Sequence, residues 1–215
     1  MLPGAVWDPV KKTGGGYFTG LRPFTGTAKK VTLHTTETSA KPNWEAQQAG
    51  IPHITADIRL KRYWQHLRFD TAAYTLKGGE HSPNSDSGVN IQIEILGYAA
   101  ESASWSDSEY DELQKILLWI SVKIGVPYVF PVKFPPHHRL SWAEWEPMSG
   151  ILGHSQTPFN DHSDPGALDV NRLTESPVDP PVEPEIPPTE GGADTALRAT
   201  LSAGLRRLAD EIDSL

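Results

Sequence analysis

Residues 89–98, VNIQIEILGY, constrain the fold more than any other segment because the polarity of their side chains alternates with a period of two. The two alternating sets are isoleucines (Ile91, Ile93 and Ile95) and polar side chains (Asn90, Gln92 and Glu94). Successive side chains of a β-strand point to opposite faces of its sheet. The run therefore predicts a strand that buries its isoleucines and points Glu94 away from the layer that they form.

An amphipathic helix is predicted directly after this strand, at residues 106–125. Ser106 and Glu109 have the spacing of a capping box, and Gly125 is a residue type that commonly ends helices. Apolar side chains recur between them at helical spacing, at Leu113, Ile116, Leu117, Ile120 and Ile124. We expect this helix to pack on the sheet.

Three further segments have strand patterns. Residues 29–35 alternate with a β-branched bias, and residues 53–60 and 62–69 form a pair of short strands. Ser141 and Glu144 repeat the capping pattern before a short helical turn. Strands and helices mix without a regular strand–helix–strand rhythm, so the sequence predicts an α/β fold with a mixed central β-sheet flanked by helices.

The composition changes at residue 175, which divides the chain into three predicted parts. Residues 1–174 form the folded domain, and residues 175–192 form a linker in which six prolines and five acidic residues fall within 175–190. Residues 193–215 form an amphipathic helix with an apolar stripe, at Leu197, Leu201, Leu205, Leu208, Ile212 and Leu215. Such a stripe predicts contact with a second copy of the chain, with a partner, or with the folded domain.

Charge and composition exclude several classes of protein. The net charge of −8 and the absence of a basic stripe argue against a nucleic-acid partner. No apolar run is long enough to span a bilayer, and the N-terminal segment lacks the apolar stretch of a secretory signal. We therefore expect a chain that is made in a cytoplasm and does not insert stably into membranes. The chain contains no cysteine, so any metal ligands must be His, Asp or Glu.

Three residues, taken together, have the side chains of a hydrolytic metal site. His34 ends a predicted strand, and the loop that begins at His154 continues into a rigid turn at Asp164. Two neutral imidazoles and one carboxylate, with a fourth position open, are a ligand set of catalytic Zn²⁺. The plainer interpretation makes His34 a partly buried strand-end histidine and the later segment a well-turned loop. The residues alone leave both interpretations open.

The segments VTLHTTET, NIQIEILGY and GILGHSQTPFNDHSDPGALD, in this order, resemble the three signature blocks of the type 2 N-acetylmuramoyl-L-alanine amidases. These zinc enzymes share their fold with peptidoglycan recognition proteins, and similar sequences are frequent among endolysins of phages that infect actinobacteria. The resemblance covers roughly residues 28–172. It implies that His34, His154 and Asp164 are zinc ligands and that Glu94 is the acidic residue that takes a proton from the attacking water.

Three further positions are compared with the family pattern, and not all of them match it. His162 stands where the family often has a Lys that faces the developing oxyanion, and we expect His162 to be catalytic in that role. Tyr74 lies at or near a site position in a block whose register is not fixed by the sequence. His53 matches a block of the family, which suggests a residue of the substrate groove or a structural residue.

The resemblance implies an enzyme that uses Zn²⁺ to hydrolyse the amide bond between N-acetylmuramic acid and L-alanine in peptidoglycan. We expect a phage lysin that stays in the host cytoplasm until it is released to the cell wall. Two alternatives remain at this stage: a recognition domain that binds peptidoglycan without cutting it, and a zinc peptidase that cuts within the stem peptide. The intact ligand positions argue against the first alternative.

Overall fold

The computed structural model describes residues 1–134 and 138–174. The predicted linker, residues 175–192, and the predicted C-terminal helix, residues 193–215, lie outside the described residues.

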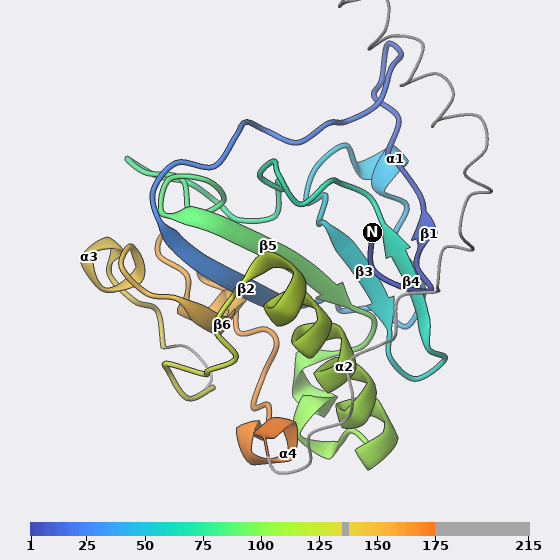
Figure 1. Ribbon diagram of the computed structural model, residues 1–215. Helices are drawn as coiled ribbons and strands as arrows, with labels where there is room; N and C mark the ends of the chain where they lie inside the picture. The colour runs from blue at the N-terminus through green and yellow to red at the C-terminus, as the bar shows by residue number, and fades with distance from the viewer. Residues whose placement is uncertain (135–137, 175–215) are drawn as a thin grey trace, which may run out of the picture. The chain divides into compact units, whose positions relative to one another are not determined.

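A mixed six-stranded sheet forms the centre of the described part of the chain (Figure 1). Its strands are β1 (Val6–Trp7), β2 (Ala28–Thr35), β3 (Ile54–Asp57), β4 (Arg62–Gln65), β5 (Gly88–Ile95) and β6 (Gly150–Gly153). Their order is β1-β4-β3-β5-β2-β6. Every neighbouring pair is parallel except the β3–β4 pair, which is antiparallel. The predicted α/β class with a mixed sheet is confirmed.

The longest helix of the described residues is α2 (Asp107–Ile124), which lies across one face of the sheet (Figure 1). Both halves of the predicted capping box form between Ser106 and Glu109, and Gly125 ends the helix with a left-handed backbone at φ 77°. The shorter helices are α1 (Trp44–Gln47), α3 (Trp142–Trp145) and α4 (Val170–Thr174), with 3₁₀ turns η1 (Ala99–Ser104) and η2 (His154–Gln156). None of the helices among residues 1–134 and 138–174 is both long and apolar enough to cross a membrane.

The main core lies between α2 and the sheet. The three isoleucines of β5 are fully buried there, together with Val31 and Leu33 of β2 and four of the predicted apolar positions of α2. The fifth position, Ile124, is partly buried and packs against the same core. Alternation in the strand and helical spacing in α2 thus place their apolar side chains in one shared layer.

The opposite face of the sheet is also buried, although its side chains are polar. Asn90 and Gln92 are fully buried, and Glu94 points away from the isoleucine layer, as predicted, at only 8% exposure. The Thr32 hydroxyl donates a hydrogen bond of 2.8 Å to Asn90 Oδ1 across the β2–β5 pair. Buried polar groups are stable only when they are paired. This face is therefore a hydrogen-bonded layer that leads to the site described below.

Strands β1 and β6 have no counterpart among the predicted elements. Each has a short sequence, VW and GILG, and each is defined by its partner: β1 pairs with β4, and β6 pairs with residues 30–33 of β2. Segments of two and four residues are too short to show an alternation, so the sequence gives no local sign of them.

Candidate metal centre and active site

Three parallel strands end at the same edge of the sheet and place the candidate residues there. Strand β2 lies between β5 and β6, and His34 is in register with Glu94. His154 directly follows β6, whose last residue, Gly153, is in register with Leu33. The carboxyl ends of parallel strands are where open α/β sheets assemble their sites. Residues far apart in sequence therefore meet at one point.

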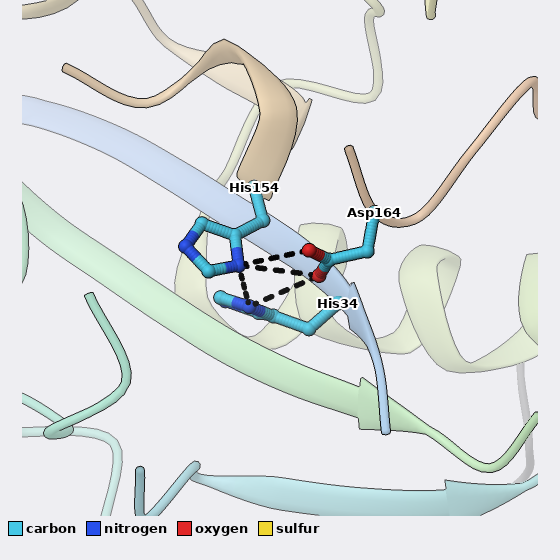
Figure 2. Close-up of side chains that lie close together, drawn as sticks. All are labelled: His34, His154 and Asp164. Carbon is cyan, nitrogen blue, oxygen red and sulfur yellow. Dashed lines mark hydrogen bonds and ion pairs between the residues drawn. The ribbon is translucent and has the colours of Figure 1, made fainter. Parts of the chain in front are cut away.

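His34, His154 and Asp164 form a buried cluster, which we call the His–His–Asp cluster (Figure 2). The two Nδ1 atoms lie 3.0 Å apart. Asp164 Oδ2 lies 3.2 Å from Nδ1 of His154 and 3.6 Å from Nδ1 of His34. The structure thus brings together all three residues that the sequence singled out as metal ligands.

The donor atoms of this cluster fit a tetrahedral metal ion. The Nε2 atom of His34 lies 2.8 Å from an amide oxygen of Gln92, and Nε2 of His154 lies 2.9 Å from an amide oxygen of Asn160. An amide oxygen only accepts hydrogen bonds, so each ring carries its proton on Nε2 and its lone pair on Nδ1. Two lone pairs and a carboxylate this close together form a donor set that could hold a cation. Tetrahedral Zn²⁺ would separate its nitrogen ligands by about 3.3 Å, close to the separations found here.

The protonation states of the cluster suit metal binding. Burial, together with the neighbouring His154, lowers the pKa of His34 to about 3, so the ring is neutral at physiological pH. Burial opposes ionisation of Asp164, but the imidazoles of His154 and His34 beside it outweigh this effect and hold the pKa of this carboxyl below its ordinary value. A neutral imidazole and an ionised carboxylate are the forms that bind metal.

Glu94 lies beside the cluster and is almost completely buried. Its Oε1 atom is 3.8 Å from Nδ1 of His34. Burial raises the pKa of Glu94 well above its ordinary value, and the charges of Asp164 and Glu37 raise it further. A carboxyl group with a raised pKa next to an ionised one is typical of a residue that accepts and returns a proton.

His162 lies at the outer edge of the cluster. Its ring stacks on His154 with centroids 4.2 Å apart and planes inclined by 16°, and its Nδ1 is 3.5 Å from Asp164 Oδ1. The His162 side chain is 64% exposed, in contrast to the buried cluster. It therefore faces the opening of the site, where a bound substrate would pass.

A groove of about 520 Å³ opens onto these residues and extends to α1. It is lined by strand-end and loop residues, helix residues and site residues: Thr35, Thr36, Glu37, Thr38, Ala40, Lys41, Pro42, Trp44, Gln47, Gly50, Thr75, Glu94, His154, His162 and Asp164. Of the cluster, His154 and Asp164 reach the groove, while His34 lies behind them. Its volume is within the range of pockets that bind small molecules.

Two residues near the site have positions that the sequence did not fix. Tyr74 is 43% exposed and stacks on Phe18, whereas its neighbour Thr75 lines the groove. His53 is fully buried: its Nδ1 accepts a hydrogen bond from the backbone N–H of Gln92, and its Nε2 donates to the carbonyl of Thr71. Burial lowers the pKa of His53 to about 4. His53 is therefore a structural residue that holds β5 in place.

Sequence reasoning missed Gln92, Asn160 and Thr75, which contact the cluster or its neighbours. Gln92 shares the parity of Glu94 in the alternating strand, and that parity was the available sign. Asn160 lies in the loop between His154 and Asp164, and Thr75 follows the exposed Tyr74. Neither of these two has a local pattern that marks it.

Comparison with known protein families gives a match that covers most of the chain. The sequence profile of the family described as N-acetylmuramoyl-L-alanine amidase matches residues 24–167, a span that contains the cluster, Glu94 and His162. No curated protein matches the chain.

Several solved structures are similar. A selenomethionine derivative of AmpD is 13% identical and aligns 80% of this chain with 97% of its own, at a TM-score of 0.47. The hydrolase AmiA of Staphylococcus aureus, in complex with its ligand, is 13% identical and aligns 78% of this chain with 80% of its own, at a TM-score of 0.45. An endolysin of a Thermus scotoductus bacteriophage is 16% identical and aligns 73% of this chain with 89% of its own, at a TM-score of 0.41. Because these identities and TM-scores are low, the family assignment rests on the match to the family's sequence profile.

Proposed function

Because this chain belongs to the N-acetylmuramoyl-L-alanine amidase family and is an amidase, we propose that it hydrolyses the bond between N-acetylmuramic acid and L-alanine in peptidoglycan with the aid of Zn²⁺. The single observation that supports zinc dependence is the convergence of the His–His–Asp cluster, whose three donor atoms lie within 4.8 Å of one another.

In this proposal, Nδ1 of His34, Nδ1 of His154 and a carboxylate oxygen of Asp164 hold the ion. When bound, Zn²⁺ lowers the pKa of a water molecule and polarises the substrate carbonyl. The ligands leave the side toward the groove open, because His154 and Asp164 line it. The scissile amide would therefore approach from the groove and not through the sheet.

Glu94 moves the proton in this reaction. Its buried carboxylate accepts a proton from the attacking water and later returns it to the nitrogen of L-alanine as the carbon–nitrogen bond breaks. Burial and the neighbouring carboxylates favour the protonated form between these two steps, which suits a group that must hold a proton briefly.

His162 supplies a hydrogen-bond donor at the mouth of the site. An imidazole N–H at this position would donate to the negative charge that develops on the carbonyl oxygen of the scissile amide. Its stacking on His154 keeps the ring beside the cluster despite its exposure.

We further propose that the enzyme is a phage lysin that waits in the host cytoplasm and reaches the wall when the membrane is opened. The resemblance of the signature segments to endolysins supports this assignment. Expression in a bacterium should then cause little lysis until a membrane-permeabilising agent is added, and the Glu94→Gln variant should not lyse cells under either condition.

Mass spectrometry of digested cell wall tests the activity itself. The proposal predicts muramic acid residues with free lactyl carboxyl groups and stem peptides that begin with a free L-alanine amine, and it predicts loss of both after zinc is removed by a chelator and recovery when zinc is restored. Cleavage inside the stem peptide would instead identify a zinc peptidase. Binding to the wall without any new termini would identify a recognition domain.

A further inference from the structure

The two imidazoles of the cluster are both held from behind by side-chain amides. His34 donates from Nε2 to Oε1 of Gln92 at 2.8 Å, and His154 donates from Nε2 to Oδ1 of Asn160 at 2.9 Å. The two amides come from different elements: Gln92 lies on β5, and Asn160 lies in the loop after η2.

The orientation of the Gln92 amide is fixed by its other neighbours. Oδ1 of Asn84 accepts hydrogen bonds from the backbone N–H groups of Thr75 and Leu76, at 3.3 and 3.0 Å, and must therefore be the oxygen of that amide. The Gln92 NH₂ group faces this oxygen at 3.4 Å, and the Thr75 hydroxyl donates to Gln92 Oε1 at 2.6 Å. A flipped Gln92 would place two oxygens against each other.

The orientation of the Asn160 amide is fixed in the same way. Its Oδ1 accepts a hydrogen bond of 3.2 Å from the backbone N–H of Lys77, and its NH₂ group donates to the carbonyls of Pro158, at 2.8 Å, and of Lys77, at 3.4 Å. A flipped Asn160 would turn its NH₂ group toward the N–H of Lys77 and its oxygen toward two carbonyls. The oxygen must therefore face His154.

From these contacts we propose that Gln92 and Asn160 are positioning residues, joined through the segment 75–77, that hold both imidazoles as the Nε2–H tautomer with Nδ1 aimed at the metal. The inference rests on the proposed function for its metal, but the tautomers are a property of the chain itself. Thr75 links this frame to the groove, because its side chain both lines the groove and donates to Gln92.

Burial makes the frame rigid. Gln92 is fully buried, Asn84 is 2% exposed and Asn160 is 5% exposed. Water cannot replace a lost partner at such positions, so a rotated amide or the other ring tautomer would leave buried polar groups unpaired. Loss of an outer hydrogen bond of this kind typically weakens metal binding 10- to 100-fold.

Four substitutions in the full-length chain test the proposal. Gln92→Met and Asn160→Leu remove the acceptor with little change in volume. Gln92→Glu keeps an oxygen for His34, but it sets its second oxygen against Oδ1 of Asn84 in place of the 3.4 Å contact, so it is compared by the tautomer of His34 alone. Thr75→Val removes one hydroxyl at a partly exposed position and is the mild variant if a buried substitution prevents folding.

Asn90→Leu is the matched control. Asn90 lies on the same strand and the same buried face as Gln92, and its amide bonds Thr32 and the carbonyl of Pro83 but neither imidazole. The Asn90→Leu variant therefore loses buried hydrogen bonds of the same kind, but none of them involves the cluster.

Two measurements are made on each protein: the dissociation constant of Zn²⁺ by competition with a chelator, and the ¹⁵N shifts of the imidazole nitrogens in the metal-free chain. We expect Gln92→Met and Asn160→Leu to bind Zn²⁺ 10- to 100-fold more weakly and to lose the Nε2–H signature of His34 and His154 respectively. Thr75→Val should show a smaller loss of zinc affinity, Gln92→Glu should keep the Nε2–H signature of His34, and Asn90→Leu should remain near the parent in both measurements.

Unchanged zinc affinity and unchanged tautomers in the folded Met and Leu variants would overturn the inference, as would an equal loss in Asn90→Leu. A parent chain that binds no Zn²⁺ would instead contradict the proposed function, while the shifts of its metal-free imidazoles would still decide the tautomer claim.

Discussion

At the residue scale, Glu94 and Asp164 are two buried carboxyl groups in one site whose pKa values are shifted in opposite directions. The neighbouring imidazoles of His154 and His34 hold the pKa of Asp164 below its ordinary value, whereas burial and the charges of Asp164 and Glu37 raise the pKa of Glu94. Environments that separate the pKa values of two carboxyls commonly separate their roles. In the proposed reaction they separate a metal ligand, Asp164, from a proton carrier, Glu94.

Glu94→Gln should therefore remove the proton carrier without disturbing the cluster. The substitution is nearly isosteric, and the contacts of His34 and His154 with Gln92 and Asn160 do not involve Glu94. We expect zinc content and melting temperature near those of the parent, and a turnover number lower by about 10²- to 10⁴-fold. Turnover on wall fragments and metal analysis measure the two effects, and full activity in this variant would assign the proton transfer to another group.

The stacked pair His154 and His162 allows a sharper contrast, because the two rings lie 4.2 Å apart but only one belongs to the cluster. His154→Ala should lose bound zinc and hydrolysis together. His162→Ala should keep its zinc and lose about 10²- to 10³-fold in turnover, since it removes one donor to the developing oxyanion. If His162→Ala also lost its zinc, His162 would be a ligand and the assignment of this exposed ring would be wrong.

Lys30 carries a buried ammonium group on β2, and no carboxylate of residues 1–134 and 138–174 forms an ion pair with it. It donates to Ser87 Oγ and to the carbonyl of Glu146, at 3.1 and 3.2 Å, and lies over the ring of Trp145. Burial lowers the pKa of Lys30 from 10.5 to about 8, against a smaller opposing effect of Glu146. Below pH 8 both the folded and the unfolded chain bind the proton, and the folded chain bears the full cost of burying the charge.

Between pH 8 and pH 10.5 the unfolded chain keeps a proton that the folded chain has released, so this lysine makes stability rise with pH across that window. The Lys30→Met variant should lack this rise in stability with pH. We expect the free energy of unfolding of the parent, relative to the variant, to increase by about 3 kcal/mol from pH 7 to pH 10.5. Chemical denaturation at several pH values measures it, with Lys29→Met as the control for charge loss at an exposed neighbouring position. A pH-independent difference would show that Lys30 keeps its proton when the chain folds.

The chemistry of the site could be predicted from single residues only in part. Resemblance marked His34, His154, Asp164, Glu94 and His162, and the structure brings all five together. Gln92 was missed because its partner His34 lies 58 positions away. Asn160 lies near its partner His154 in the chain, but the orientation of its amide depends on Lys77, 83 positions away. No spacing within one segment contains that information.

At the element scale, local patterns predicted the elements whose stabilisation is local. The capping box of α2 and the alternation of β5 involve neighbours in sequence, and both are present as expected. Strand β6 differs, because its four residues are a strand only through pairing with residues 30–33 of β2. The sequence of β6 could not show a pairing with a strand more than a hundred residues earlier.

The start of β5 depends on a glycine that the pairing with β2 requires. Gly88 has φ 108°, and a Cβ atom there would lie 2.1 Å from the carbonyl oxygen of Ala28, its register partner. Gly14 has a similar φ of 96° but nothing within 4 Å of such an atom. The two positions therefore separate the cost of the backbone conformation from the cost of the contact.

Gly14→Ala should lower the free energy of unfolding by about 1–2 kcal/mol, the cost of the left-handed backbone alone. Gly88→Ala should add a further ~3 kcal/mol, because the backbone of β2 cannot move away without breaking the sheet. It should also weaken zinc binding, since β5 carries Gln92. Urea denaturation of both variants gives the comparison. Equal losses would mean that β2 and β5 separate easily at this end.

At the scale of the whole molecule, the order of the strands explains how the site forms. Strand β2 is central to it, with β5 and β6 parallel on either side. Parallel neighbours end at the same edge, so His34, Glu94 and His154 meet without any of their segments being close in sequence. The core is completed by α4, whose Leu173 is buried in the same cluster as the apolar face of α2. Every residue to which the proposed reaction gives a role lies before residue 174.

A chain that ends after Thr174 should accordingly fold, bind zinc and hydrolyse wall fragments at the rate of the full chain. The removed residues, 175–215, carry the predicted linker and the leucine stripe, and we expect the full chain but not the shortened one to associate with itself. Sedimentation gives the mass of each form, and the double variant Leu201→Asp, Leu208→Asp in the full chain tests the stripe without shortening. A monomeric full chain would assign the stripe to a different partner. A shortened chain that folds but no longer cuts would show that the stripe serves the catalytic domain itself.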